Sequence, residues 1–182
     1  MSMRITSGSA KGRKLNVPKG NDIRPTTDKV RQAVFNILLS YDLPVNANII
    51  DIFCGSGALG LEGLSRGASH AVLIDRDTAT AKDNAQDLGF ADQTTILRKD
   101  ATKIGTRPET MPQADLVFAD PPYNKDLLVP SLTALKDGGW LADDAVIIAE
   151  TEKHFDWSQV AGFTLQDTRL YGDCRIHILT TE

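Results

Sequence analysis

One stretch of the chain decides the fold: Asp51-Ile52-Phe53-Cys54-Gly55-Ser56-Gly57-Ala58-Leu59-Gly60. Its glycines have the spacing Gly-x-Gly-x-x-Gly. They stand between an apolar run typical of a strand, residues 49–53, and a helical pattern at residues 58–66. Glycine lets the backbone turn tightly and approach a ligand closely, at the point where open parallel sheets bind cofactors. Glycines that serve only a tight turn are the simpler alternative.

Beyond this loop, apolar and β-branched runs alternate with helical patterns. Strands are expected at residues 49–53, 71–75, 95–98, 116–120 and 145–150, and helices at residues 58–66, 78–88 and 125–136. The alternation predicts an α/β fold with a mostly parallel central sheet covered on both faces. Two alternating runs at residues 164–170 and 175–180 predict a C-terminal antiparallel hairpin.

The chain before the glycine loop is expected to add two more elements. Residues 3–6 and 13–17 flank Gly8 and Gly12, which predicts a small N-terminal β-hairpin. Residues 28–39 repeat their apolar side chains at helical spacing, so a helix there is expected to pack on the body.

Charge is distributed unevenly along the chain. Of 20 basic and 24 acidic side chains, residues 1–31 hold eight basic and two acidic ones, which leaves 12 basic and 22 acidic for the rest. This division suggests an anion-binding arm on an acidic body, although a charge run alone is as often a solvated face. The arm residues expected to contact nucleic acid are Arg4, Lys11, Arg13 and Lys14.

Length and composition narrow the class of protein. A chain of 182 residues with 41% hydrophobic content suits one domain, 1–182, with a basic extension at 1–24 and a core at 25–182. No apolar stretch reaches the roughly 20 residues of a membrane span, and no signal peptide pattern is present. We therefore expect a cytoplasmic protein with no membrane partner. Two cysteines and three scattered histidines lack metal-site spacing, so no metal is expected.

Acidic residues at the ends of successive strands indicate which ligand the glycine loop holds. The loop pattern also suits a dinucleotide, but a carboxylate at Asp51 would repel pyrophosphate and attract the positive amino-acid end of S-adenosylmethionine. Asp75 suits ribose hydroxyls at the end of the next strand, and Asp100-Ala101 suits an adenine ring after the third. S-adenosylmethionine is thus the predicted cofactor. The predicted cofactor-binding residues are Asp51, Gly55, Gly57, Asp75, Arg76, Asp100 and Ala101.

The fourth strand ends in Asp120-Pro121-Pro122-Tyr123, which predicts a catalytic loop. Two prolines remove N–H donors and restrict the loop. The Asp120 carboxylate and the Pro121 carbonyl can then accept the hydrogens of a base amino group and orient its lone pair toward a sulfonium methyl. Tyr123 is expected to stack on the base. Cys54, the candidate for methylation at a ring carbon, is interpreted as an apolar residue beside the cofactor.

These segments resemble the family of bacterial 16S ribosomal RNA guanine-N2 methyltransferases, over nearly the whole chain. The resemblance rests on Arg4-Ile5, Lys11 to Leu15, Arg24-Pro25-Thr26-Thr27-Asp28-Lys29-Val30-Arg31, residues 51–66 and residues 120–123. It implies a Rossmann-like class I methyltransferase fold with an antiparallel last strand, a guanine N2 amino group in 16S rRNA as target, and a small-subunit particle as partner. It also implies that Arg24, Thr26, Thr27 and Arg31 cover the cofactor or orient RNA. The family pattern leads us to expect alanine at Cys54 and Gly63 and glutamate at Asp75.

Three other functions remain open at this point. DNA adenine-N6 or cytosine-N4 amino-methyltransferases share the catalytic loop but usually carry a target-recognition region, for which this chain has little room. Methylation of a protein glutamine would lead us to expect asparagine in place of Asp120. A noncatalytic RNA-binding or ribosome-assembly factor can retain the same fold without the reaction.

Overall fold

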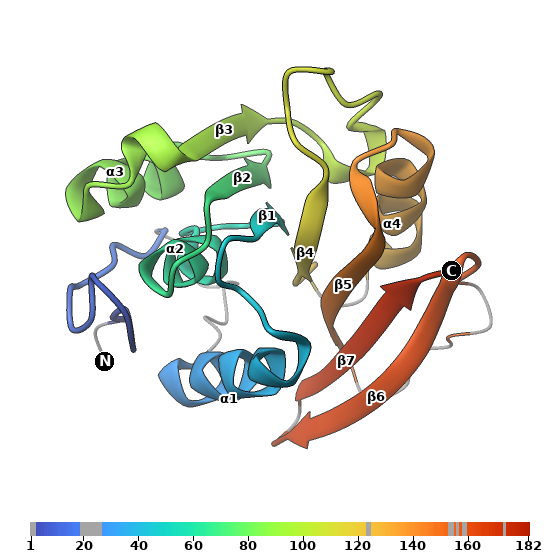
Figure 1. Ribbon diagram of the computed structural model, residues 1–182, viewed down its shortest axis with the longest axis horizontal. Helices are drawn as coiled ribbons and strands as arrows, with labels where there is room; N and C mark the ends of the chain where they lie inside the picture. The colour runs from blue at the N-terminus through green and yellow to red at the C-terminus, as the bar shows by residue number, and fades with distance from the viewer. Residues whose placement is uncertain are drawn as a thin grey trace.

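The computed structural model describes residues 3–18, 27–122, 125–152, 155, 157, 160–172 and 174–182. Its centre is a seven-stranded sheet in the order β3-β2-β1-β4-β5-β7-β6 (Figure 1). The strands are β1 (Asn48–Ile52), β2 (His70–Asp75), β3 (Thr94–Arg98), β4 (Ala114–Ala119), β5 (Leu141–Thr151), β6 (Phe163–Tyr171) and β7 (Cys174–Thr181). Strands β1 to β5 pair in parallel, whereas β7 pairs antiparallel with both β5 and β6. The predicted mostly parallel sheet with a C-terminal antiparallel hairpin is confirmed.

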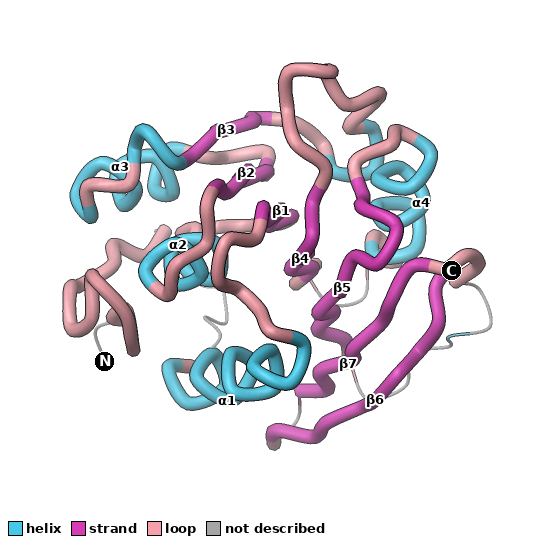
Figure 2. Tube along the Cα trace, in the orientation of Figure 1, coloured by secondary structure: helices cyan, strands magenta, loops and turns pink. Residues whose placement is uncertain are grey.

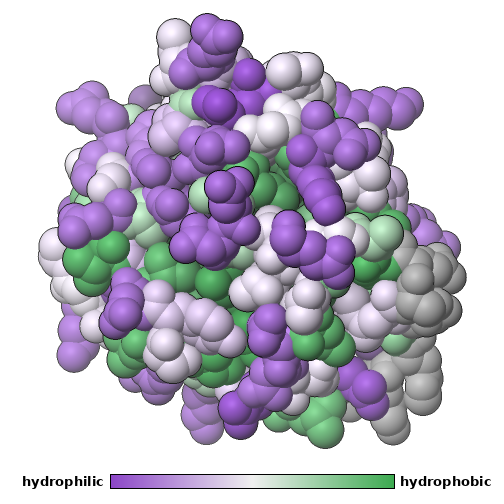
Figure 3. Space-filling view, turned by 45° about the vertical axis from the view of Figure 1, so that its right-hand side comes forward, coloured by the Kyte–Doolittle hydropathy of each residue, from purple (hydrophilic) through white to green (hydrophobic). Residues whose placement is uncertain are grey.

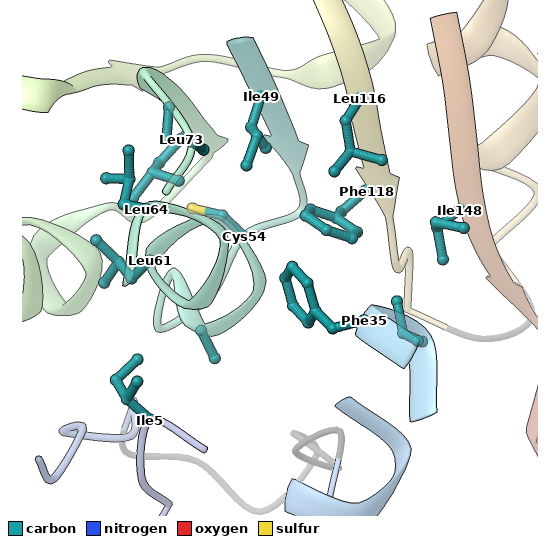
Figure 4. Close-up of a cluster of buried hydrophobic side chains, with 14 of the residues drawn as sticks. Ile5, Phe35, Ile49, Cys54, Leu61, Leu64, Leu73, Leu116, Phe118 and Ile148 are labelled. Carbon is teal, nitrogen blue, oxygen red and sulfur yellow. The ribbon is translucent and has the colours of Figure 1, made fainter. Parts of the chain in front are cut away.

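Helices cover both faces of this sheet, as Figures 1 and 2 show. They are α1 (Asp28–Leu38), α2 (Ala58–Ser65), α3 (Ala79–Leu88) and α4 (Leu128–Asp137). Successive strand residues point to opposite faces, and Ile49 accordingly packs with α1 to α3 while Ile50 packs with α4. Figure 4 shows Phe35 of α1 against Phe118 of β4, with ring centroids 5.5 Å apart.

Local side-chain signals set the starts of α1 and α3. The Thr27 side chain accepts a hydrogen bond from the Val30 backbone N–H at 3.3 Å, which caps α1. The Asp77 carboxylate accepts from Ala79 N–H at 3.1 Å, so it caps α3 although Thr78 occupies the N-cap position. The predicted helix at 125–136 is corrected at its start, because α4 begins only at Leu128. Asp126 has φ of +50°, a left-handed conformation that no helical residue adopts.

The predicted N-terminal hairpin is present in short form: Arg4 and Lys14 form an antiparallel bridge, flanked by bonds from Ile5 N–H to the Arg13 carbonyl and from Leu15 N–H to the Met3 carbonyl, both at 3.0 Å. Residues 3–18 are here called the arm, and the turn of this hairpin bonds to α2. Ser9 N–H donates to the Ser65 carbonyl at 2.8 Å, for example. Met3, Ile5, Ala10 and Leu15 are buried in the same hydrophobic cluster as α2. The arm is therefore fastened along the body rather than projecting from it.

The surface is mixed in character. Figure 3 shows hydrophobic residues reaching the surface in separate patches between hydrophilic ones. No helix in the described part of the chain is both long and apolar enough to cross a membrane.

Candidate active site

The glycine loop joins β1 to α2 at the carboxyl edge of the sheet. Gly55 and Gly57 have φ of +53° and +75°, which side chains other than glycine rarely adopt. A Cβ added at Gly55 would meet nothing within 4 Å, whereas one at Gly57 would lie 2.9 Å from Leu73 Cδ1. Gly57 thus permits close packing of α2, and Gly55 is the glycine whose backbone borders open space.

Asp75, at the end of β2, ties this loop to the neighbouring strand. One carboxylate oxygen accepts a hydrogen bond from Gly55 N–H at 2.9 Å, and the other accepts from the N–H groups of Arg76 and Asp77 at 2.6 and 3.3 Å. The side chain is half-buried and lies at the same sheet edge as Gly55. A ribose-binding role for Asp75 remains a prediction, and its location at this edge is compatible with it.

The side chain of Asp51 is almost completely buried. Only 2% of its surface is exposed, and its carboxylate accepts a hydrogen bond from Gly60 N–H of α2 at 2.9 Å. Burial raises the pKa of Asp51 to about 7, the bond from Gly60 opposes that rise, and the nearby Asp75 charge adds to it. The Asp51 carboxylate therefore holds the start of α2 through Gly60, and its predicted contact with the amino-acid end of the cofactor remains a prediction.

Asp100, after β3, is held in the charged form. Its carboxylate accepts from the Thr102 hydroxyl and N–H at 2.7 and 3.0 Å, and it pairs with Arg76 at 2.6 Å. The Thr102 hydroxyl contributes most, followed by Arg76, to a pKa of about 2 for Asp100. Ala101 beside it is buried. The predicted cofactor residues Asp75, Arg76 and Asp100 thus lie together along the ends of β2 and β3.

The chemistry of this edge fits S-adenosylmethionine. Gly55 offers backbone next to open space, and carboxylates follow at the ends of β2 and β3, so donors and acceptors for an amino-acid end, a ribose and an adenine occur in the order of the strands. Asn84, which the sequence analysis did not single out, supports the glycine loop. The buried amide of Asn84 donates to the Ser56 carbonyl and to the Asn16 carbonyl, both at 2.9 Å, which links the loop to the arm.

The predicted catalytic loop begins where β4 ends. Asp120 is half-buried and follows Ala119, which pairs with Ala149 of β5, so Asp120 lies beside Glu150. Both acidic residues border a small hollow, here called the Asp120 hollow, that α1, α2 and β7 complete through Val34, Leu59 and Ile176. Pro121 is buried and Pro122 is exposed. Tyr123 lies outside the described residues, as do Arg24 and Thr26.

A second hollow, here called the loop hollow, shares Glu150 with the first in its lining. It has an empty volume of about 320 Å³, part of it open to solvent. Its lining includes Pro121, Pro122, Lys125, Asp126, Glu150, Glu152 and Phe155. Of these, only the two prolines were expected from the sequence. Glu150 carried a usable signal, because it ends a predicted parallel strand, and ligands bind at the carboxyl ends of such strands.

Cys54 occupies a structural position. Cys54 is buried among Leu61, Leu64 and Leu73 (Figure 4), and burial, followed by the charges of Asp51 and Asp75, raises its pKa. It is therefore a thiol at neutral pH, which disfavours a covalent cysteine adduct. Within the described residues, no three histidine, cysteine or acidic side chains gather as a group that could hold a metal ion.

The basic residues predicted to bind substrate differ in exposure. Arg4, Lys11, Arg13 and Lys14 are exposed on the arm. The Arg13 guanidinium donates to the carbonyls of Leu88, at 3.1 Å, and Asp87, which fixes the arm to the end of α3.

The side chain of Arg31, which was predicted to cover the cofactor or orient RNA, is fully buried. It pairs with Glu62 at 3.3 Å and with Asp28 at 2.8 Å, and it donates to the Arg4 carbonyl. Thr27, predicted to act beside it, caps α1. Both residues therefore shape the elements around the site.

Comparison with known proteins places this site in context. A family model described as Conserved hypothetical protein 95 matches residues 3–180. "Ribosomal RNA small subunit methyltransferase D" of Escherichia coli K12 is 41% identical over 152 residues, covering 82% of this chain and 75% of that protein. "Putative rRNA methyltransferase YlbH" of Bacillus subtilis 168 is 36% identical over 166 residues, which are 88% of each chain.

Solved structures agree with the topology. The structure described as "Putative methyltransferase yhhF from Escherichia coli" superposes with a TM-score of 0.82 at 36% identity, covering 100% of this chain and 99% of that one. The predicted Rossmann-like class I methyltransferase fold is confirmed, and S-adenosylmethionine is the methyl donor that this fold and these relatives imply.

Proposed function

The chain belongs to the family described as Conserved hypothetical protein 95, and from this we propose that it methylates the exocyclic N2 amino group of a guanine in 16S rRNA of the small ribosomal subunit. The supporting observation is that Asp120-Pro121 ends β4, directly beside β1, whose end carries the glycine loop. The proposed acceptors of the amino group and the glycine loop therefore lie at the same edge of the sheet. The relative named small subunit methyltransferase D supports ribosomal RNA as the substrate.

Bound S-adenosylmethionine supplies an electrophilic methyl group on a positively charged sulfur. The protein's task is to present a weak nucleophile to it, because the amino lone pair of guanine is delocalised into the ring. The Asp120 carboxylate and the Pro121 carbonyl each accept one N2 hydrogen and so turn the lone pair toward the methyl group. The methylated nitrogen is strongly acidic, and Asp120 accepts its proton. Tyr123 stacks on the base once it has left the RNA helix.

The exposed arm residues Arg4, Lys11 and Lys14 bind RNA phosphates in this proposal, with Arg13 bound to α3 beside them. The rest of the chain is acidic and would repel RNA, so a basic arm fixed near the cofactor edge sets where the RNA approaches. A small-subunit particle is the partner that the family resemblance implies. Binding in the cytoplasm, where ribosomal subunits are assembled, follows from that partner.

Mapping of modified nucleotides tests the proposal. We expect a deletion strain to lose one N2-methylguanine from its small-subunit rRNA, detected by mass spectrometry of nuclease fragments. The wild-type gene and Asp92→Ala, an exposed residue of the η2 turn (Ala91–Gln93), should restore it, whereas Asp120→Ala should not. Unaltered small-subunit rRNA in the deletion strain would refute the proposal. Missing methyl groups in DNA would favour a DNA amino-methyltransferase, and restoration by Asp120→Ala would favour a noncatalytic RNA-binding factor.

A further inference from the structure

The side chains that line the loop hollow are of the kinds that bind nucleic-acid bases. It shares Glu150 with the Asp120 hollow, and its walls carry carboxylates, one ammonium group and one aromatic ring. These side chains belong to Asp126, Glu150, Glu152, Lys125 and Phe155. Glu150 is the only acidic residue of the described chain that borders this hollow and the Asp120 hollow together. Asp120 and Glu150 follow the paired residues Ala119 and Ala149 at the ends of β4 and β5, so the two carboxylates lie side by side at the Asp120 hollow.

The wall behind Glu150 is held rigidly. Thr151, the next residue, bonds through its hydroxyl to His177 Nε2 at 2.8 Å, and His177 Nδ1 bonds to the Thr168 hydroxyl at 2.8 Å. The Trp157 ring packs on His177 with centroids 4.5 Å apart, and Phe155 packs on Trp157 at 4.6 Å. These contacts connect β5, β6, β7 and the segment after β5. Such support holds the side chains of a recognition site in place.

The three amino-bearing bases differ in the atom next to the amino group. Guanine presents, in order, the N2 hydrogens, the N1 hydrogen and the O6 acceptor. Adenine presents its N6 hydrogens and then the unprotonated N1, and cytosine presents its N4 hydrogens and then the unprotonated N3. A carboxylate beside the amino-binding group therefore attracts guanine and repels the ring nitrogen of the other two. An ammonium group one position further along complements O6.

We propose that Glu150 is the specificity-determining residue that selects guanine, by accepting the N1 hydrogen while Asp120 holds the amino group. Lys125 donates to O6 in the same bound base, and Phe155 forms part of the surrounding wall. This inference rests on the proposed function. It explains how a loop shared with adenine and cytosine methyltransferases is restricted to one base.

A base analogue can test recognition of the N1 and O6 positions while keeping the amino group that reacts. 2,6-Diaminopurine keeps the reacting N2 amino group but has an unprotonated N1 and an amino group in place of O6. Small subunits reconstituted with guanine or 2,6-diaminopurine at the mapped target position are methylated with radiolabelled cofactor. We expect wild-type kcat/KM to favour guanine by roughly tenfold or more. Glu150→Gln, whose amide can donate to N1, should reduce or reverse this preference.

Glu152→Gln is the matched control, because Glu152 lines the loop hollow but not the Asp120 hollow. It should leave the ratio of the two kcat/KM values near the wild-type ratio. Equal loss on both substrates in Glu150→Gln, or a changed ratio only in Glu152→Gln, overturns the inference. Failure of the proposed function looks different, since wild-type enzyme would then leave even the guanine particle unmethylated.

Discussion

Asp51 makes the stability of the fold depend on pH. The pKa of Asp51 is raised from 3.8 to about 7 in the folded chain, so between these values the folded chain keeps a proton that the unfolded chain has released. The stabilisation from this group is complete below pH 3.8 and is lost as the pH rises to about 7. We expect urea unfolding to show that wild-type protein gains stability relative to Asp51→Asn on going from about pH 8 to about pH 5. A pH-independent difference between the two proteins would contradict the raised pKa.

His177 gives the stability of the fold a pH dependence of the opposite sign. Burial, followed by the charge of Arg175, lowers its pKa from 6.5 to about 4. Its stabilising effect is therefore present above pH 6.5 and is lost as the pH falls to about 4. The free energy of unfolding of wild-type protein, relative to His177→Gln, should fall between about pH 7 and about pH 5. The two variants thus serve as controls for each other, since their pH slopes should have opposite signs.

Part of the candidate site could be predicted from the types of residue at the ends of the strands. Asp75 and Asp100 were recognisable because each follows a strand, and strand ends are visible in a local pattern. The burial of Arg31 could not be predicted, because its partner Glu62 is 31 positions away and no local pattern indicates that a charge is buried and paired. The glycine at Gly63, where the family pattern led us to expect alanine, likewise has no local explanation. A Cβ there would lie 2.2 Å from Ile49 Cδ1, so the glycine serves packing between α2 and β1.

At the scale of elements, docking of the arm on α2 can be tested with two glycines of the same conformation. Gly8 and Gly12 both have φ of +82°, but a Cβ at Gly8 would lie 1.7 Å from the Ser65 carbonyl oxygen while one at Gly12 would meet nothing within 4 Å. Gly12→Ala should cost about 1–2 kcal/mol of unfolding free energy through backbone strain alone. Gly8→Ala should cost clearly more, as measured by urea denaturation. Equal losses would mean that the arm does not dock as described.

Glu62 joins three elements through one buried carboxylate. It accepts from Thr6 N–H at 2.8 Å and pairs with Arg31 of α1 at 3.3 Å and with Arg66 at the end of α2 at 2.9 Å. Glu62→Gln leaves the buried Arg31 without this charge, and we expect a loss of about 3–5 kcal/mol in the free energy of unfolding. The exposed pair of Arg169 and Asp167 is the control, and Arg169→Ala should cost no more than about 1 kcal/mol. Similar losses in both variants would contradict the role of Glu62.

Element types followed from the sequence more readily than their pairing partners. Each predicted strand of the sheet lies within a few residues of an observed one, because alternation and capping are local signals. The arm was predicted as a hairpin since residues 3–6 and 13–17 carry a suitable pattern. Residues 3–5 and 12–15 do pair through backbone hydrogen bonds, but the turn between them also bonds to Glu62 and Ser65, more than 50 positions away. Docking on so distant a partner cannot be predicted from the pattern of the segment itself.

At the scale of the whole molecule, the separation of charge predicts a salt-dependent interaction with RNA. Lys11→Gln combined with Lys14→Gln should weaken binding to small-subunit rRNA and reduce the slope of log affinity against log salt by roughly 0.7 to 0.9 for each phosphate that the arm no longer neutralises. Affinity for S-adenosylmethionine should not change. Lys103→Gln is the control, because this exposed lysine lies in the η3 turn (Ala101–Lys103) that packs against α4. An unchanged salt slope in the double variant would exclude the arm as the RNA-binding surface.

The fastening of the arm has a consequence for the order in which the chain is completed during synthesis. Residues 3–18 leave the ribosome before the side chains that hold them, because Glu62, Ser65 and Asn84 follow 55 to 68 positions later. Domains form during synthesis as their segments emerge, so the arm has no docking surface until α2 and α3 have been made. Its final conformation is therefore a late event, and an incomplete chain carries its most basic segment unanchored.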